Sequence, residues 1–141
     1  AQLSFVCSDL SHLSDFTKPF SNSIYRLLKE YLPGPYTFIL PASKMVPKIL
    51  QSKKDTIGLR IPDNKIAMAI VKELGRPILS ASLPGDMVED YTDPEVMYEN
   101  FGTQADFVIN GGIGGTVPST IIDCTGEEPV LIREGLGEWK E

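Results

Sequence analysis

Short apolar segments separated by proline and glycine turns recur along this chain, and their order constrains its fold more than any other feature. The pattern predicts strands over residues 3–7, 36–40, 56–61, 78–82, 106–110, 119–124 and 130–133. It predicts a helix through residue 31 that is capped within Ser21-Asn22-Ser23, and a helix over 66–74 that is capped by Pro62-Asp63-Asn64 and closed by Gly75. It also predicts helices over 45–50 and 94–100 and an acidic loop over 83–93. Strands and helices alternate early and strands follow one another late. The order therefore predicts an α/β fold built on a mixed, twisted sheet.

The size and composition of the chain exclude several classes of protein. Its 141 residues suit one domain, and no apolar run approaches the roughly 18 residues of a membrane-spanning helix. Cys7 and Cys124 are far apart, and His12 is the single histidine, which leaves too few ligands for a zinc site. Covalent catalysis by a Cys-His or Ser-His-Asp arrangement is disfavoured, because it would have to use His12, which lies in a polar stretch typical of a loop or short turn. We expect reduced thiols, a cytoplasmic location and no association with membranes.

Charge is distributed unevenly along the chain. Residues 1–76 hold 11 Lys or Arg and 6 acids, whereas residues 77–141 hold 2 and 13. A basic cluster comprises Lys44, Lys48, Lys53, Lys54, Arg60 and Lys65. It could receive the phosphates of a nucleotide or RNA, and it fits a solvated surface equally well. The glycine loop at 111–115 lacks the ending of a phosphate-binding loop and precedes a strand, so we expect only a tight chain reversal there.

Five strings, taken in order and spacing, connect the chain to a known family. They are PGPYTFIL (33–40), TIGLRIPDN (56–64), ILSASLPG (78–85), VPSTIIDCT (117–125) and VLIREG (130–135). Together they resemble the YrdC domain of L-threonylcarbamoyladenylate synthases, and more closely its YciO-like branch. The resemblance covers residues 1–141 as a single YrdC-like domain. It implies a twisted open mixed sheet with helices, folded around a concave basic cleft.

The resemblance also implies a reaction. ATP, L-threonine and bicarbonate would form threonylcarbamoyl-AMP and pyrophosphate, the first stage of a tRNA adenosine modification. ATP would be a substrate accompanied by Mg²⁺, with no tightly bound cofactor. Family members also bind double-stranded RNA. A nucleotide- or RNA-binding module without synthase activity is the alternative, and a purely structural interaction domain is a third hypothesis.

The matching positions name a candidate site. By resemblance, the threonine site holds Arg60, Ser80 and Ser119, and the nucleotide site holds Thr56, Ser82 and Arg133. A guanidinium at the end of a strand can bind a carboxylate in a bidentate manner. Ser80 and Ser82 would share one face of their strand, and Ser82 replaces an asparagine of the family pattern. Thr120 is expected to bond backbone. No residue is assigned to covalent catalysis or to binding a metal.

The front of the chain departs from the family pattern. The family's K-x-R pair and its P-T-[DE]-T-x-Y-G-L string do not occur here. We therefore expect an N-terminally truncated domain that is inactive alone and binds ATP weakly. Unpaired strand edges tend to recruit another chain, so self-association is expected through the edge near residues 3–7 or through the open cleft.

Overall fold

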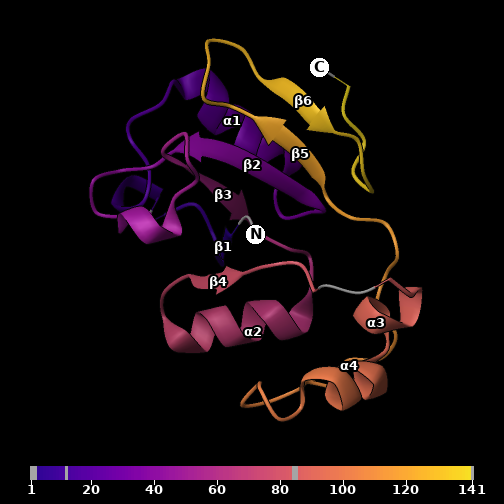
Figure 1. Cartoon of the computed structure of the whole chain (residues 1–141). Helices are drawn as coiled ribbons and strands as arrows, with labels where there is room; N and C mark the ends of the chain where they lie inside the picture. The colour runs from indigo at the N-terminus through magenta and orange to yellow at the C-terminus, as the bar shows by residue number, and fades with distance from the viewer. Residues whose placement is uncertain (1–2, 12, 84–85, 141) are drawn as a thin grey trace. The chain divides into compact units, whose positions relative to one another are not determined.

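The computed structural model describes residues 3–11, 13–83 and 86–140, in two compact units (Figure 1). The larger unit comprises the described residues of 1–81 and 119–141, and the smaller one comprises those of 82–118. That the whole chain forms one domain stays a prediction. No helix in the described part of the chain is long and apolar enough to cross a membrane.

A six-stranded mixed sheet forms the centre of the larger unit. Its strands are β1 (Ser4–Val6), β2 (Tyr36–Pro41), β3 (Thr56–Arg60), β4 (Ile78–Ser80), β5 (Thr120–Asp123) and β6 (Val130–Arg133). They follow the order β4-β1-β3-β2-β5-β6. The pairs β1/β3 and β2/β5 are parallel, and the other three pairs are antiparallel. The α/β class and the mixed open sheet expected from the sequence are confirmed.

Two helices begin and end at residues suited to those positions. α1 (Asn22–Tyr31) starts after Ser21, whose hydroxyl accepts a hydrogen bond from the Ile24 amide. α2 (Lys65–Leu74) starts after Asn64, whose side-chain oxygen accepts from the Ala67 amide at 3.0 Å. Gly75 ends α2 with φ of 77°, a left-handed conformation in which glycine carries no Cβ penalty.

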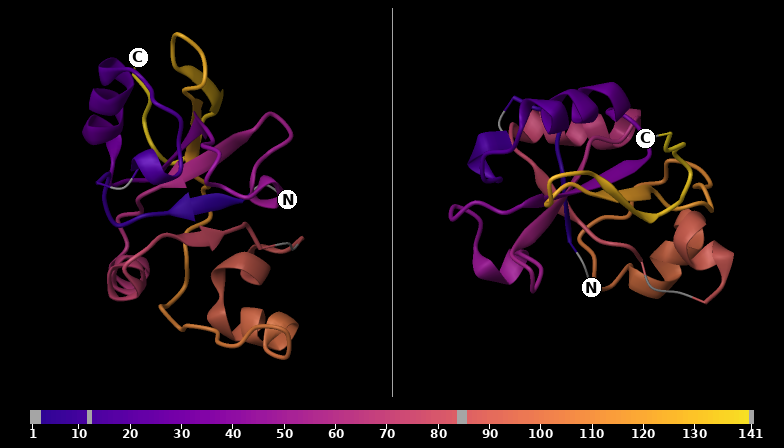
Figure 2. Two further views of the ribbon diagram at one scale, coloured as in Figure 1. Left: turned by 90° about the vertical axis from the view of Figure 1, so that its left-hand side faces the viewer. Right: turned by 90° about the horizontal axis from the view of Figure 1, so that it is seen from above.

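Both helices lie on the same side of the sheet, as two views show (Figure 2). The side chains of Phe38, Leu59 and Ile122 point to that side and are almost completely buried, as is Leu28 of α1. Residues paired across strands share a face, and neighbours along a strand alternate between faces. The opposite face of the sheet, here called the open face, therefore carries the residues one position away from this core. Among them are Ser4, Thr37, Ile39, Thr56, Gly58, Arg60, Asp123 and Arg133.

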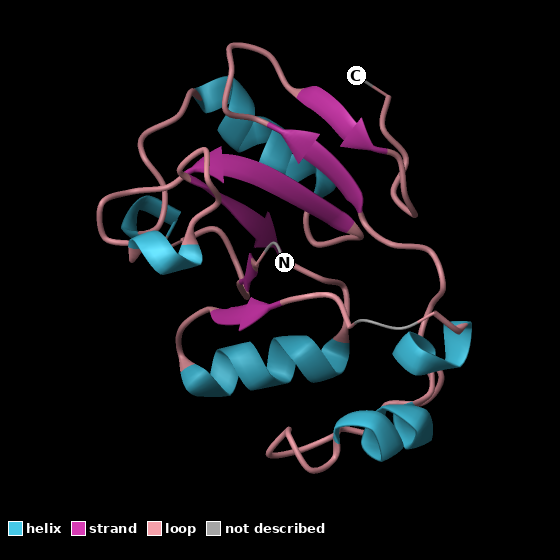
Figure 3. Ribbon diagram, viewed as in Figure 1, coloured by secondary structure: helices cyan, strands magenta, loops and turns pink. Residues whose placement is uncertain are grey.

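The smaller unit differs most from the sequence-based expectation. It contains α3 (Val88–Thr92), inside the segment expected to be a loop, and α4 (Pro94–Phe101). The strand expected over 106–110 is wrong, since no strand forms between α4 and β5 (Figure 3). A strand needs a paired backbone, and no described residue supplies one there. The helix expected over 45–50 is one turn of 3₁₀ helix, η2 (Lys48–Leu50); another, η1, spans Leu13–Asp15.

The location expected for self-association is also wrong in part. β1 lies between β3 and β4 and pairs with both, so the segment near residues 3–7 is not an edge of the sheet. Among the described strands, the edges are β4 and β6. All four residues of β6 are exposed. Self-association itself stays a prediction, and sedimentation velocity tests it.

The two thiols should make the stability of the fold sensitive to alkaline pH. Burial, and secondly the charge of Asp9, raises the pKa of Cys7 to about 11. Burial, and secondly Asp123, raises the pKa of Cys124 to about 12. The folded chain thus holds these protons more tightly than the unfolded chain, where a thiol titrates near 8.5. The stabilisation is complete below about pH 8.5 and is lost as the pH rises toward these values.

We expect the urea midpoint of unfolding to fall between pH 8.5 and 10.5, and to fall less in a Cys7→Ala, Cys124→Ala variant. The wild-type chain should also react slowly with iodoacetamide at pH 8 and quickly in urea. Equal pH dependence in the two proteins would show that the thiols contribute nothing to it.

Candidate functional site

Arg60 ends β3 with its side chain on the open face. Its Nε is buried and has no hydrogen-bond partner among the described residues. Burial lowers the pKa of Arg60, and the positive charge of Arg133 lowers it further. A partly desolvated guanidinium near a second positive charge destabilises the fold of the protein when no ligand is bound. This is the arrangement expected where an anionic ligand supplies the missing partner.

Ser119 and Arg133 are joined by hydrogen bonds. Arg133 donates to the Ser119 carbonyl from Nε at 3.1 Å and from Nη2 at 2.8 Å. Nη2 also lies 3.4 Å from the Ser119 hydroxyl oxygen. That hydroxyl is 2.8 Å from the hydroxyl of Thr37. Arg133 is thereby held over the start of β5, with its guanidinium next to the Ser119 hydroxyl.

Strand register explains why these residues meet. β2 and β3 are antiparallel and pair Phe38 with Leu59, so the next pair in the register places Thr37 opposite Arg60. β5 runs parallel to β2, so Ser119 precedes β5 next to the start of β2. β6 returns antiparallel and pairs Arg133 with Ile121. Thr37, Arg60, Ser119 and Arg133, here called the arginine site, therefore gather at one end of the open face.

Thr56 lies at the other end of β3. Three residues of β3 lie between it and Arg60, so the two Cα atoms are about 13 Å apart at the usual rise. Its hydroxyl is 2.6 Å from that of Ser52. The two positions expected in threonine and nucleotide binding thus share a face of the sheet and are well separated along it.

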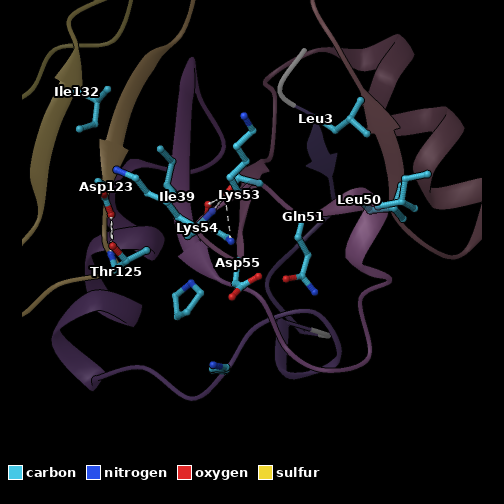
Figure 4. Close-up of a pocket in the computed structure, with 15 residues that line it drawn as sticks. Leu3, Ile39, Leu50, Gln51, Lys53, Lys54, Asp55, Asp123, Thr125 and Ile132 are labelled. Carbon is cyan, nitrogen blue, oxygen red and sulfur yellow. Dashed lines mark hydrogen bonds between the residues drawn. The ribbon is translucent and has the colours of Figure 1, made fainter.

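A cavity of about 740 Å³ adjoins Thr56 (Figure 4). The open face contributes Ile39, Asp123 and Ile132 to its wall. The segment from η2 to β3 contributes most of the remainder, including Lys53 and Lys54. Lys18 and Asp55 complete its charged lining. The cavity is therefore basic by three lysines against two aspartates, which suits a ligand with negative charge.

Of the two serines predicted to lie on one strand, only Ser80 belongs to β4. Ser80 ends β4 and pairs with Ser4, and its hydroxyl lies 3.5 Å from the Ser4 carbonyl oxygen. It belongs to the open face because Ser4 pairs in turn with Gly58. Ser82 lies beyond the end of β4 and is exposed, so the expected pair of serines on one strand is wrong. The sequence-based strand was two residues too long.

Two threonines differ in how well the sequence predicted their roles: that of Thr120 was predicted, and that of Thr37 was not. Thr120 is fully buried, donates to the Gly137 carbonyl at 2.6 Å and accepts from the Gly135 amide at 3.0 Å. Its predicted role in bonding backbone is confirmed. Thr37 was missed by sequence reasoning, although its place in the string PGPYTFIL, one residue before the core residue Phe38, puts it on the open face. His12 lies outside the described residues.

Comparison with known proteins then decides the family. The family model Sua5_yciO_yrdC, described as telomere recombination, matches residues 1–135. The chain belongs to this family. An uncharacterised protein of Haemophilus influenzae is 48% identical over 135 residues, which are 94% of this chain and 65% of that protein. The Escherichia coli protein YciO is 45% identical over 138 residues, or 96% of this chain and 66% of YciO. The chain thus spans about two thirds of the length of these relatives.

Solved structures of family members share the fold. The crystal structure of E. coli YciO matches with a TM-score of 0.87 and 42% identity, covering 97% of this chain and 67% of that one. The structure of Pyrococcus abyssi Sua5 complexed with L-threonine matches with a TM-score of 0.82 and 29% identity, covering 95% and 40%. The YrdC-like fold expected from the sequence is confirmed.

Proposed function

We propose that the arginine site binds the carboxylate of L-threonine, as part of a threonylcarbamoyl-AMP synthase activity. The observation that carries the proposal is the buried, unpartnered Nε of Arg60 close to Arg133. Neither arginine forms an ion pair within the described residues. A carboxylate would accept hydrogen bonds from Arg60 and offset its repulsion with Arg133. Two P. abyssi relatives support this choice of ligand: a threonylcarbamoyl-AMP synthase that is 36% identical over 112 residues, and Sua5 complexed with L-threonine.

In the proposed reaction, the threonine amino group and bicarbonate form a carbamate and release water. A carbamate oxygen then attacks the α-phosphorus of ATP, the bond to the β-phosphate oxygen breaks, and pyrophosphate leaves. Arg60, Ser80 and Ser119 hold threonine, while Thr56 and Arg133 face the nucleotide. Such a step depends on positioning and charge neutralisation, not on a covalent nucleophile.

Magnesium enters this proposal only with ATP. No group of three His, Cys, Asp or Glu side chains able to hold a metal is present in the described ranges. The ion would therefore be held chiefly by the phosphates of ATP. We further propose that the reaction takes place in the cytoplasm, where ATP and tRNA are both present.

The direct test is pyrophosphate release by the intact gene product supplied with ATP and Mg²⁺. We expect release that depends on both L-threonine and bicarbonate, so that omission of either returns the rate to background. Release that is indifferent to either compound, or absent with all of them present, would contradict the synthase proposal.

The second candidate is a nucleotide- or RNA-binding module without synthase activity. It is favoured by the basic lining of the Thr56 cavity, which includes Lys18, Lys53 and Lys54. The lysines of the Thr56 cavity would contact phosphates. This function predicts salt-sensitive binding of ATP or double-stranded RNA, without threonine-dependent pyrophosphate release.

A further inference from the structure

The hydroxyl of Ser119 is contacted from two sides within the protein. Thr37 Oγ1 lies 2.8 Å away, and Arg133 Nη2 lies 3.4 Å away. A serine hydroxyl has one hydrogen to donate and two lone pairs that accept. Arginine can only donate, so Arg133 occupies an acceptor position of Ser119. The direction of the bond between Ser119 and Thr37 then decides what the serine can offer a ligand.

Burial sets that direction. Thr37 is only 7% exposed, and Ser119 is the sole hydrogen-bond partner of its hydroxyl within the described residues. If Thr37 accepted from Ser119, the hydrogen of this almost fully covered side chain would have no partner among the described residues, at a cost of about 1–3 kcal/mol. The arrangement of lower cost has Thr37 as the donor. Both acceptor positions of Ser119 are then filled, and its own hydrogen is directed at a ligand.

The backbone beside Thr37 holds its side chain in this orientation. Gly58, on the neighbouring strand β3, lies so close that an added Cβ would be 3.3 Å from the methyl carbon of Thr37 and 2.9 Å from the hydroxyl of Ser4. The absence of a side chain at Gly58 therefore accommodates the threonine methyl group. With the methyl placed there, Oγ1 is directed toward Ser119 at 2.8 Å.

We propose that Thr37 is a positioning residue that makes the Ser119 hydroxyl an obligate hydrogen-bond donor, so that the arginine site selects ligand oxygens that only accept. This inference rests on the proposed function and extends it to specificity. Carboxylate and phosphate oxygens meet the requirement. A carboxamide meets it poorly, because its NH₂ group would face the donors of Arg60, Ser119 and Arg133.

The test compares Thr37→Val and Thr37→Ser with the wild-type chain by calorimetric titration of L-threonine, L-threoninamide and ATP. Valine keeps the branched shape and removes the donor, whereas serine retains the donor. We expect Thr37→Val to weaken L-threonine binding about tenfold, the loss of one charge-assisted hydrogen bond, and L-threoninamide binding less than twofold. Thr37→Ser should stay within twofold of wild type for both. If Ser119 faces a phosphate, the tenfold loss appears with ATP instead.

Thr17→Val is the matched control. Thr17 is also buried, and its hydroxyl donates to the Leu13 carbonyl at 3.0 Å, outside the arginine site. The Thr17→Val substitution should leave the affinities for L-threonine, L-threoninamide and ATP unchanged. Should Thr37→Val fail to fold, Thr37→Ala replaces it. In a Ser119→Ala background, removal of the Thr37 hydroxyl should cause no further loss, because its effect passes through Ser119.

Each remaining outcome decides the inference. Equal weakening of L-threonine and L-threoninamide, or no change with any probe, would overturn it. Wild-type protein that binds ATP but not L-threonine would contradict the threonine-binding proposal alone, and the ATP titrations would then decide the role of Thr37. Wild-type protein that binds none of the three probes would overturn both.

Discussion

Replacing Arg60 by methionine is expected to abolish L-threonine binding and, at the same time, to stabilise the ligand-free protein. Methionine retains the length of the side chain and removes a half-buried charge whose Nε has no partner among the described residues. It also removes the repulsion with Arg133. The affinity for L-threonine should fall at least 100-fold, since bidentate charge-assisted bonds contribute about 3 kcal/mol. The free energy of unfolding should rise by about 1 kcal/mol.

Arg26 supplies the control for this prediction. It is an exposed arginine of α1, so Arg26→Met should leave L-threonine binding unchanged and alter stability by less than about 0.5 kcal/mol. Arg60→Lys should give intermediate binding, because lysine keeps the charge without the planar fork. Calorimetry and urea unfolding measure the two effects. An Arg60→Met protein that binds normally, or that is clearly destabilised, would contradict this account of the site.

The second large effect is expected in the core. Phe38 is fully buried on the helix side of β2, with its ring centroid 6.2 Å from that of Tyr36 and 6.5 Å from that of Tyr31. Phe38→Ala removes most of an aromatic side chain from a site that cannot collapse easily. The free energy of unfolding should fall by about 3–5 kcal/mol. This is a large share of the roughly 5–15 kcal/mol by which domains are stable.

Phe107 offers the matched comparison, since its side chain is 88% exposed. Phe107→Ala should change the free energy of unfolding by less than about 0.5 kcal/mol. Urea denaturation followed by circular dichroism measures both variants. Similar losses in the two proteins would mean that Phe38 does not hold the central position described for it.

Local signals in the sequence predicted α1, α2 and α4, but not α3. Ser21, Asn64 and Gly75 act on backbone groups within a turn of their own position, so their effects are readable from the sequence alone. The expected strand over 106–110 shows the limit of such reasoning. Its composition is typical of a strand, but a strand forms only where another backbone pairs with it, and pairing is decided far along the chain.

The arginine site shows the same division. Arg60 could be singled out from the sequence because its chemistry and its place at the end of a strand are local features. The role of Thr37 could not, because it depends on β5 lying next to β2 and bringing Ser119 within 2.8 Å. The charge of Arg133 beside Arg60 depends likewise on β6 returning along β5. The pairing of strands that are distant in the sequence thus decides which side chains meet, and the motifs alone do not contain this information.

The central claim is that the guanidinium of Arg60 binds an anionic ligand. ¹⁵N NMR of the arginine side chains tests this claim most directly. The Nε–H signal of Arg60, assigned by its loss in Arg60→Lys, should shift progressively and saturate as L-threonine is added, with a much smaller shift for L-threoninamide. The Nε–H signal of Arg26 should stay in place. An Arg60 signal that does not move while the protein is saturated with L-threonine would contradict the claim.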